Sequence, residues 1–508
     1  MIKTIFFVVS VVFFIQVDAQ QVIHNRNHQV IFNLKITDID NPDSVTVMWF
    51  LQPYIDGVTE DHVVMFPHNL NDKGLYQQSI SFPDSIIGRT IAYRYLAANG
   101  KTDFWRQIVL EKNGNQNILE SWGFVDGLEG KIRPTKMLFP TPNSPAENDL
   151  FEKPYVGITT DGKAIDNLFP IIKTGFSTAP IKNAVVTFIQ TLTEEQKTKS
   201  IFPIESKEWR RWHNIESWPR AGLCLEEMNS RQKELVFNLL AESLSSRGLQ
   251  KVKDIMSMEA YLAVLVPEVK ALGREKYWFT FYGSPSDTEP YGWQIEGHHI
   301  VINYFVLGDQ VVMTPIFMGS EPNYNESGEN EGLRTFVVEE KKGLDFYKSL
   351  TKKQKVEATI LHKKEYDFNR SEAFRDNEII PISGISARKL SKKQQKALLE
   401  LIAEYVNNLR EGQAIIKMEE VQHYLKETNF SWVQGDNPDG PFYYRIHSPV
   451  ILIEFDHQTP VFIYDPSNPY PGPVKSHIHT VVRTPNGNDY GKDLLREHLE
   501  KEHKKDNY

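Results

Sequence analysis

The chain is organised around residues 292–315, which read GWQIEGHHIVINYFVLGDQVVMTP. β-Branched and aromatic residues crowd both sides of the Gly308-Asp309 pair, so the stretch predicts two strands joined by a tight turn. Side chains alternate between faces along a strand. One face of the first predicted strand carries Gln294, Glu296 and His298. The other face carries Trp293, Ile295 and His299. A polar cluster followed by apolar residues is typical of a strand that enters a pocket.

Length and composition indicate a soluble globular protein. A chain of 508 residues is long enough for two or three domains with real cores. With 24% charged residues and a net charge of -9, the chain does not have the excess of basic residues that is typical of a nucleic-acid binder. We therefore expect no nucleic-acid partner.

The N-terminus predicts export. Lys3 precedes an apolar run from Thr4 to Val17, and small or apolar residues then precede Gln20, which is typical of a signal peptide over residues 1–19. No other stretch approaches transmembrane length, so we expect a secreted or periplasmic protein with no spanning segment after cleavage. Cys224 is the only cysteine, which excludes an intramolecular disulfide and a multi-cysteine metal site.

Residues 20–119 predict a small β-sandwich. Five short apolar alternations, separated by turns and without a helical run, support this accessory domain. Residues 120–154 are rich in proline, which indicates an extended connector.

Residues 155–508 predict a larger α+β domain with an internal duplication. Four helix starts place an N-cap residue three positions before a Gln, at Thr193, Asn229, Thr351 and Ser391. Thr351 follows Thr193 by 158 residues and Ser391 follows Asn229 by 162. The hairpin of residues 292–315 also overlays residues 443–466 without gaps, at an offset of 151. We therefore expect repeat halves over about residues 181–340 and 341–508, each a set of helices followed by a hairpin. The alternative is a coincidence of two helix-plus-sheet units.

The overlay suggests a shared catalytic cleft. It matches Gln294 with Arg445 and Glu296 with His447. An approximate two-fold axis between the halves would bring the polar residues at the start of both hairpins to one cleft. A carboxyl group and an imidazole that share such a cleft suit general acid–base chemistry, so Glu296 and His447 are the candidate catalytic pair.

A histidine pair near the C-terminus suggests a metal site. His477, His479 and Arg483 share one face of a predicted strand. An H-x-H pair can chelate a divalent metal such as zinc, and His298, His299 or Glu296 would supply a third ligand while leaving a position for water. We take His298 with His477 and His479 as the candidate ligands. The alternative is that these histidines satisfy buried backbone and carboxylate groups.

Aromatic, amide and charged residues near these strands complete the candidate site, and the absence of known motifs excludes some enzyme classes. The candidate substrate-binding residues are Trp293, Gln294, Arg445, Arg483 and Asp489. The segment from Trp209 to Arg220 fits either a sugar-stacking surface or a corner between helices, and the usual burial of Trp favours the corner. The sequence has no nucleophile elbow, Walker loop, Rossmann glycine run or HExxH motif.

Four stretches resemble a known family. They are residues 291–299 (YGWQIEGHH), 313–322 (MTPIFMGSEP), 443–449 (YYRIHSP) and 477–491. In these stretches, the chain from Tyr155 onward is similar to the DUF3500 family, which has no assigned reaction. Relatives are often exported, sometimes with twin-arginine signals that suit proteins folded around a cofactor. The predicted signal peptide of this sequence, residues 1–19, has no such arginine pair.

These features together predict an exported hydrolase. We expect it to act, with metal assistance, on an extracellular carbohydrate or another polar substrate. The alternative is a non-catalytic secreted or periplasmic protein that binds a small molecule or glycan in its cleft. The substrate and the oligomeric state are left open by the sequence.

Overall fold

The structure, a computed structural model, falls into two compact units. It describes residues 151, 153–364, 367–435, 437–463 and 472–505, together with seven strands between residues 28 and 121. One unit comprises Met1–Gly100 and Ile108–Trp122, and the other comprises Lys101–Gln107 and Gly123–Tyr508. The predicted signal peptide lies outside the described residues, as do residues 122–150 of the predicted connector.

The first unit contains the strands expected for residues 20–119. The strands are β1 (His28–Lys35), β2 (Val45–Gln52), β3 (Asp61–Pro67), β4 (Leu75–Phe82), β5 (Thr90–Ala97), β6 (Arg106–Val109) and β7 (Gln116–Ser121). They are hydrogen-bonded in the order β6-β5-β2-β3-β4-β1-β7. The five predicted strands correspond to β1, β2, β4, β5 and β6. The packing of these strands as a sandwich stays a prediction.

The second unit is built on one large mixed sheet. Its strands are β8 (Ile201–Phe202), β9 (Leu223–Cys224), β10 (Tyr277–Gly283), β11 (Tyr291–Gly297), β12 (Ile300–Leu307), β13 (Gln310–Val312), β14 (Ile316–Ser320), β15 (Thr359–Leu361), β16 (Ile385–Ser386), β17 (Asn429–Gln434), β18 (Phe442–His447), β19 (Leu452–His457) and β20 (Ile478–Arg483). The main path runs β15-β17-β18-β19-β20-β14-β12-β11-β10-β8.

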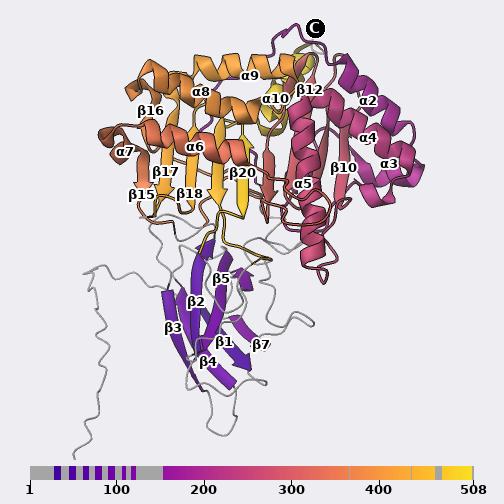
Figure 1. The fold of residues 1–508 in the computed structure, drawn as a ribbon. Coiled ribbons are helices and arrows are strands. Elements are labelled where there is room, and N and C mark those ends of the chain that lie inside the picture. The colour runs from indigo at the N-terminus through magenta and orange to yellow at the C-terminus, as the bar shows by residue number, and fades with distance from the viewer. Residues whose placement is uncertain are drawn as a thin grey trace, which may run out of the picture. The chain divides into compact units, whose positions relative to one another are not determined.

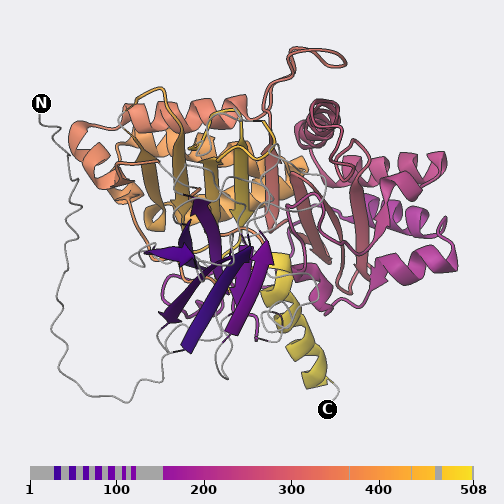
Figure 2. The same ribbon diagram turned by 90° about the horizontal axis from the view of Figure 1, so that it is seen from below.

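Helices accompany this sheet, which confirms the predicted α+β class. They are α2 (Ala179–Ile189), α3 (Glu194–Ser200), α4 (Ser230–Ser243), α5 (Ser246–Leu265), α6 (Val337–Ser349), α7 (Lys352–Ala358), α8 (Lys392–Val406), α9 (Glu411–His423) and α10 (Lys492–Lys505). Figure 1 shows α6, α8 and α9 over one half of the sheet and α2, α4 and α5 beside the other. Figure 2 shows α10 on the opposite side of the sheet from α6 and α8.

The sheet has an apolar face that forms the main core with the helices. Trp293, Tyr304, Tyr444 and Phe455 belong to one buried cluster that also includes residues of α2, α4, α5, α6, α8 and α9. Trp293 stacks on Tyr304 with ring centroids 5.0 Å apart. Burying these aromatic side chains supplies a large apolar area, which is what holds the helices on the sheet.

The opposite face is unusually polar. Residues paired directly across neighbouring strands share a face. The pairing that starts at Glu296 crosses the sheet through Val301, Phe317, Val481, Glu454 and Arg445. A second row joins Gly319, His479, Asp456 and Tyr443. We call this side the polar face, and its carboxylates and basic groups are buried.

The organising stretch of residues 292–315 differs from its prediction in one respect. The Gly308-Asp309 turn is present between β12 and β13, where Leu307 pairs with Gln310. The single strand expected before that turn is instead two antiparallel strands, β11 and β12. They reverse at His298 and His299, because Gly297 pairs with Ile300 and His299 adopts a left-handed φ of 62°. The two histidines therefore do not alternate along one strand.

The two halves of the second unit follow the same plan. All four predicted capping boxes are formed, at Thr193, Asn229, Thr351 and Ser391. The sheet order is mirrored about the β14–β20 pair, with short β8 and β15 at its two ends. Gly292 pairs with Phe305 and Tyr443 pairs with Asp456, which is the same register at the offset of 151.

Among the described residues, none of the helices has both the length and the apolar character required to cross a bilayer.

We predict that Gly343→Ala destabilises the protein. A change from glycine to alanine inside a helix usually stabilises it by about 1 kcal/mol. Here the added Cβ would lie 2.2 Å from Cε1 of Tyr444, under helix α6. Overpacking costs about 1–3 kcal/mol, so we expect a lower urea midpoint despite the better helix former.

The control is Lys341→Ala on the same helix, whose side chain is 71% exposed. Its midpoint should stay close to that of the parent protein. A midpoint for Gly343→Ala at or above that of the parent protein would contradict the close approach of α6 to Tyr444.

Candidate metal centre

Three histidines from distant segments meet at one edge of the polar face. His299 lies in the β11–β12 turn, His477 directly precedes β20, and His479 lies within β20. Strand β14 separates β12 from β20, and its Gly319 pairs with His479. A Cβ on Gly319 would lie 2.6 Å from Cδ2 of His299 and 3.0 Å from Cδ2 of His479. Glycine at this position therefore lets the two rings approach each other across the strand.

The ring nitrogens of these three histidines are arranged as metal ligands would be. One nitrogen from each lies within 4.8 Å of the others, and all three residues are buried. The two Nε2 atoms of His477 and His479 are 3.0 Å apart. Two ligand nitrogens at a Zn–N distance of about 2.0–2.1 Å in a tetrahedral site are about 3.3 Å apart. The observed separation is close to that value.

The opposite ring nitrogens are held by acceptors. Nδ1 of His477 lies 2.8 Å from the carbonyl oxygen of Thr459, and Nδ1 of His479 lies 3.0 Å from Oε1 of Glu372. If each Nδ1 carries the ring proton, both Nε2 atoms present lone pairs to each other. Facing lone pairs repel unless a cation lies between them, and such outer carboxylate and carbonyl partners are typical of metal-binding imidazoles.

His299 is strained and one of its nitrogens lacks a partner. Its left-handed φ costs on the order of 1–3 kcal/mol for a residue with a side chain. Oδ1 of Asn214 accepts the backbone N–H of His299 at 2.8 Å, which holds the turn in place. Nε2 of His299 is buried without a hydrogen-bond partner in the part of the chain that the structure describes. This nitrogen is therefore available to a metal ion that the other two histidines also bind.

Burial keeps this cluster ready to bind a cation. Burial lowers the pKa of His299 well below its usual range, and the neighbouring imidazoles lower it further. Burial and His479 likewise lower the pKa of His477. Burial would raise the pKa of Glu372, but its contact with His479 outweighs that effect and leaves the pKa lowered. The two histidines are therefore neutral, as metal ligands must be, beside an ionised carboxylate.

A second group adjoins the first. His298, His299 and Glu259 of α5 also offer ligand atoms within 4.8 Å of one another. Nδ1 of His298 lies 2.7 Å from Oε2 and 2.8 Å from Oε1 of Glu259. Burial lowers the pKa of His298, but Glu259 raises it more strongly, so the net shift is upward. This pair is a buried acid–base group beside the three-histidine cluster.

The structure changes the candidate ligand set, which consisted of His298, His477 and His479. It groups His299, rather than His298, with His477 and His479. The rings of His298 and His299 lie side by side, with centroids 3.7 Å apart. Nδ1 of His298 is bound to Glu259, however, whereas the ring of His299 lies next to those of His477 and His479. Glu259, Thr459 and Glu372 carry no motif, so the sequence offered no signal for them.

The predicted catalytic pair is not brought together. Strands β11 and β18, which carry Glu296 and His447, are separated by β12, β14, β20 and β19. At about 4.8 Å per strand, the two residues are about 24 Å apart across the sheet. Burial raises the pKa of Glu296 to about 8, and burial lowers the pKa of His447 to about 3. Each group is buried separately on the polar face.

The predicted substrate-binding side chains face the interior. Trp293 lies on the apolar face, against Tyr304. Nε2 of Gln294 donates to the carbonyl oxygen of Trp209 at 3.0 Å and to Oδ1 of Asn303 at 2.6 Å. Nη2 of Arg445 donates to Oγ of Ser383 at 2.8 Å. The polar groups of Gln294 and Arg445 therefore bind the protein itself.

Arg483 is the centre of a buried ionic network. Nη1 of Arg483 donates to Oδ1 of Asp376 at 2.8 Å and to Oδ2 of Asp489 at 3.2 Å. Its Nε and Nη2 donate to the carbonyl oxygens of Ser371 and Glu372 at 2.7 and 2.8 Å. Arg483 and Asp489 therefore fix the loop that carries Glu372 beneath the histidine cluster, in place of the predicted contact with substrate.

The Trp side chains between Trp209 and Arg220 are buried, as predicted. The segment leads from a short 3-10 helix (Lys207–Arg210) to strand β9, however, and does not form a corner between two α-helices. Trp209 and Trp212 are each 1% exposed. Nε of Arg210 donates to Oδ2 of Asp376 at 2.7 Å, which ties the segment to the same network. Cys224 is a buried free thiol, and burial raises its pKa.

Comparison with known proteins identifies one family. The sequence profile of the family described as "Protein of unknown function (DUF3500)" matches residues 174–492. None of the curated proteins matches the chain. A crystal structure of CBMd, of family CBM41, from Eubacterium rectale Amy13K shares 14% identity, with a TM-score of 0.16, over 19% of this chain and 90% of that one. A likeness at that TM-score carries no argument about this protein.

We predict that the protein binds a divalent metal at the three histidines. Purified protein loaded with Zn²⁺ and then desalted should retain about one ion per chain by elemental analysis. His477→Ala and His479→Ala should lose it. Glu372→Gln should weaken metal affinity by about 10–100-fold, because it replaces the carboxylate that orients His479 with a neutral and weaker acceptor. His362→Ala, which alters an exposed histidine, is the control and should bind normally.

We also predict that Arg483→Met is strongly destabilising. Removing the cation leaves the carboxylates of Asp376 and Asp489 buried without it, which costs about 3–5 kcal/mol. Arg496→Met removes a 53% exposed arginine and should change the free energy of unfolding by less than about 0.5 kcal/mol. Equal urea midpoints for Arg483→Met and the parent protein would restore Arg483 as a candidate for contact with substrate.

Proposed function

This chain belongs to the DUF3500 family, whose members are described as proteins of unknown function, and we propose that it is a metal-dependent hydrolase. The observation that carries the proposal is the convergence of His299, His477 and His479 with outer acceptors already in place. Three imidazole ligands and an open fourth position are typical of catalytic zinc, whereas structural zinc uses four protein ligands.

The ion, when bound, would lower the pKa of a bound water to about 7 and polarise the bond under attack. The chain's own residues hold and orient it. The three histidines supply the ligands, while the Thr459 carbonyl and the Glu372 carboxylate orient the rings of His477 and His479. Glu259 and His298 are the acid–base pair next to this cluster, so we assign proton transfer to them.

We propose that the substrate is polar and extracellular, such as a glycan. The apolar N-terminal run after Lys3 supports export to the periplasm or the medium. Glu296 and His447 do not act as a pair in this mechanism, because the sheet holds them about 24 Å apart.

We propose further that the two halves of the second unit are copies of one ancestral unit. The mirrored strand order, the matched capping boxes and the common register at an offset of 151 support this.

We predict that metal-loaded protein hydrolyses at least one member of a panel of chromogenic esters, phosphoesters and glycosides, together with natural glycans. Removing the metal with a chelator should abolish turnover, and Zn²⁺ should restore it. His479→Ala should be inactive, and His362→Ala should match the parent protein. Glu259→Gln should bind metal normally but turn over about 10²–10⁴-fold more slowly, because it lacks the proton-transfer carboxylate.

Stoichiometric metal in a folded protein that turns over none of these substrates would refute the hydrolase. The non-catalytic binding protein would then be the better account. Protein that retains no metal but still turns over a substrate would refute the metal mechanism.

A further inference from the structure

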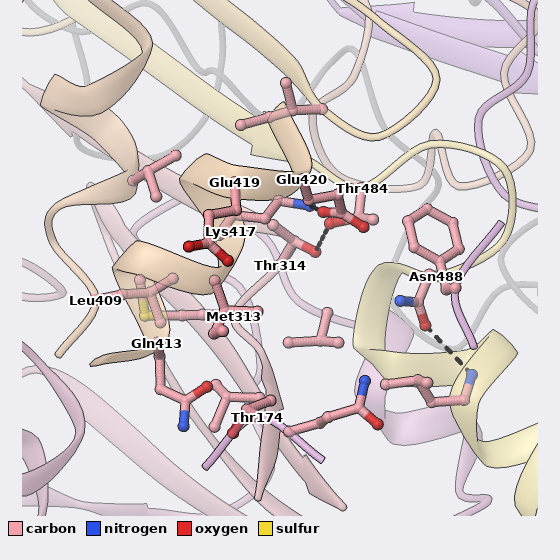
Figure 3. A pocket seen from close by; sticks show the side chains of 18 of the residues that line it. Thr174, Met313, Thr314, Leu409, Gln413, Lys417, Glu419, Glu420, Thr484 and Asn488 are labelled. Atoms are coloured by element: carbon pink, nitrogen blue, oxygen red, sulfur yellow. Dashed lines mark hydrogen bonds and ion pairs between the residues drawn. The ribbon is translucent and has the colours of Figure 1, made fainter. Parts of the chain in front are cut away.

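A cavity lies away from the histidine cluster, between helix α9 and the start of β14. Its volume is about 390 Å³, within the range of pockets that hold small molecules. The walls come from α9, from the segment around Leu168 and Phe169, and from residues 310–316 and 482–494 (Figure 3). None of the three clustered histidines lines it. A ligand here would therefore be separate from the proposed metal centre.

The interior of this cavity is apolar. Its walls include Met313, Val406, Leu409, Ile416, Ile451 and Val482. The polar groups among them bind other protein groups: the hydroxyl oxygens of Thr314 and Thr484 are 2.7 Å apart, and Nε2 of Gln413 donates to the carbonyl oxygen of Asp309 at 3.1 Å. Since apolar cavities of this kind exclude water and accept hydrocarbon, the body of a ligand would be aliphatic.

Charged residues of α9 gather at one end of the cavity. Figure 3 shows Lys417, Glu419 and Glu420 close together in the upper part of the view, with Leu409 and Met313 below them. The ammonium of Lys417 has three donors, and the structure gives it Oε2 of Glu420 at 2.6 Å and the carbonyl oxygen of Val450 at 2.8 Å. Two carboxylates accompany this one cation. A third donor is left for a ligand oxygen, but the surplus of negative charge disfavours an anion.

We propose that this cavity binds a neutral amphiphile, an aliphatic chain that ends in a hydroxyl or carbonyl oxygen. The chain would occupy the apolar interior. The terminal oxygen would accept from Lys417, and a hydroxyl could also donate to Glu420. A carboxylate would be repelled by the surplus negative charge of Glu419 and Glu420. An ammonium has no lone pair to accept from the third donor of Lys417.

The test compares three probes with the same chain: octan-1-ol, octanoate and octylammonium. Isothermal titration of the full-length protein should show octan-1-ol binding at one site per chain, with the two ions binding about tenfold more weakly or not at all. No octan-1-ol binding in the millimolar range would overturn the proposal. Tighter binding of either ion would overturn the assignment of a neutral head group.

Adjacent isoleucines on α9 provide matched variants. Ile416 lines the cavity, whereas Ile415 is 43% exposed and does not. Ile416→Trp should fill the cavity and weaken octan-1-ol binding at least about tenfold, while Ile415→Trp should leave it unchanged. Equal binding by both variants would place the octan-1-ol elsewhere. Metal content, measured in parallel, should be unchanged in both, which shows that the variants are folded and that the two sites are independent.

Discussion

The pairing of β14 with β20 is the contact on which the site depends. It joins the two halves of the sheet through five residue pairs, from Ile316–Val482 to Ser320–Ile478. It also places Gly319 opposite His479, with β12 and its His299 turn on the other side of β14. Residues 178 positions apart in the sequence, His299 and His477, thereby become neighbours. Without this central pairing, neither half holds more than part of the cluster.

The polar face makes the site rigid. Burying charged groups is costly unless each is paired, and most of them here are. Arg483 binds Asp376, Asp489 and two carbonyls of the loop that carries Glu372, so the orientation of Glu372 is fixed from below. Among the described residues, Nε2 of His299 is a buried atom without a partner. Other buried polar atoms in the described part of this unit also lack a partner, but within the three-histidine cluster the unpaired ring nitrogen belongs to His299.

The halves share a plan but differ in chemistry. At the offset of 151, the turn of His298 and His299 corresponds to Pro449 and Val450, which cannot bind a metal. In the proposed duplication, the first half kept or acquired the imidazoles at this turn, while the second half supplies His477 and His479. The cavity beneath α9 is lined by residues of both halves, among them Met313 and Ile451. A repeated scaffold therefore supports two different environments, one polar and one apolar.

The sequence by itself determined the α+β class, the four capping boxes and the Gly308-Asp309 turn. These features depend on local periodicity, capping chemistry and turn residues, all of which are read from short stretches of sequence. The sequence misjudged the strand through His298 and His299, since a two-residue turn without glycine or asparagine at its centre has no local signal. Only the tertiary structure decided that His299 joins His477 and His479, that Glu296 and His447 stay apart, and that Arg483 is structural. Those outcomes depend on the order of the strands in the sheet and on which loops cover the polar face. The residue spacing within one segment does not specify which distant segment it will contact.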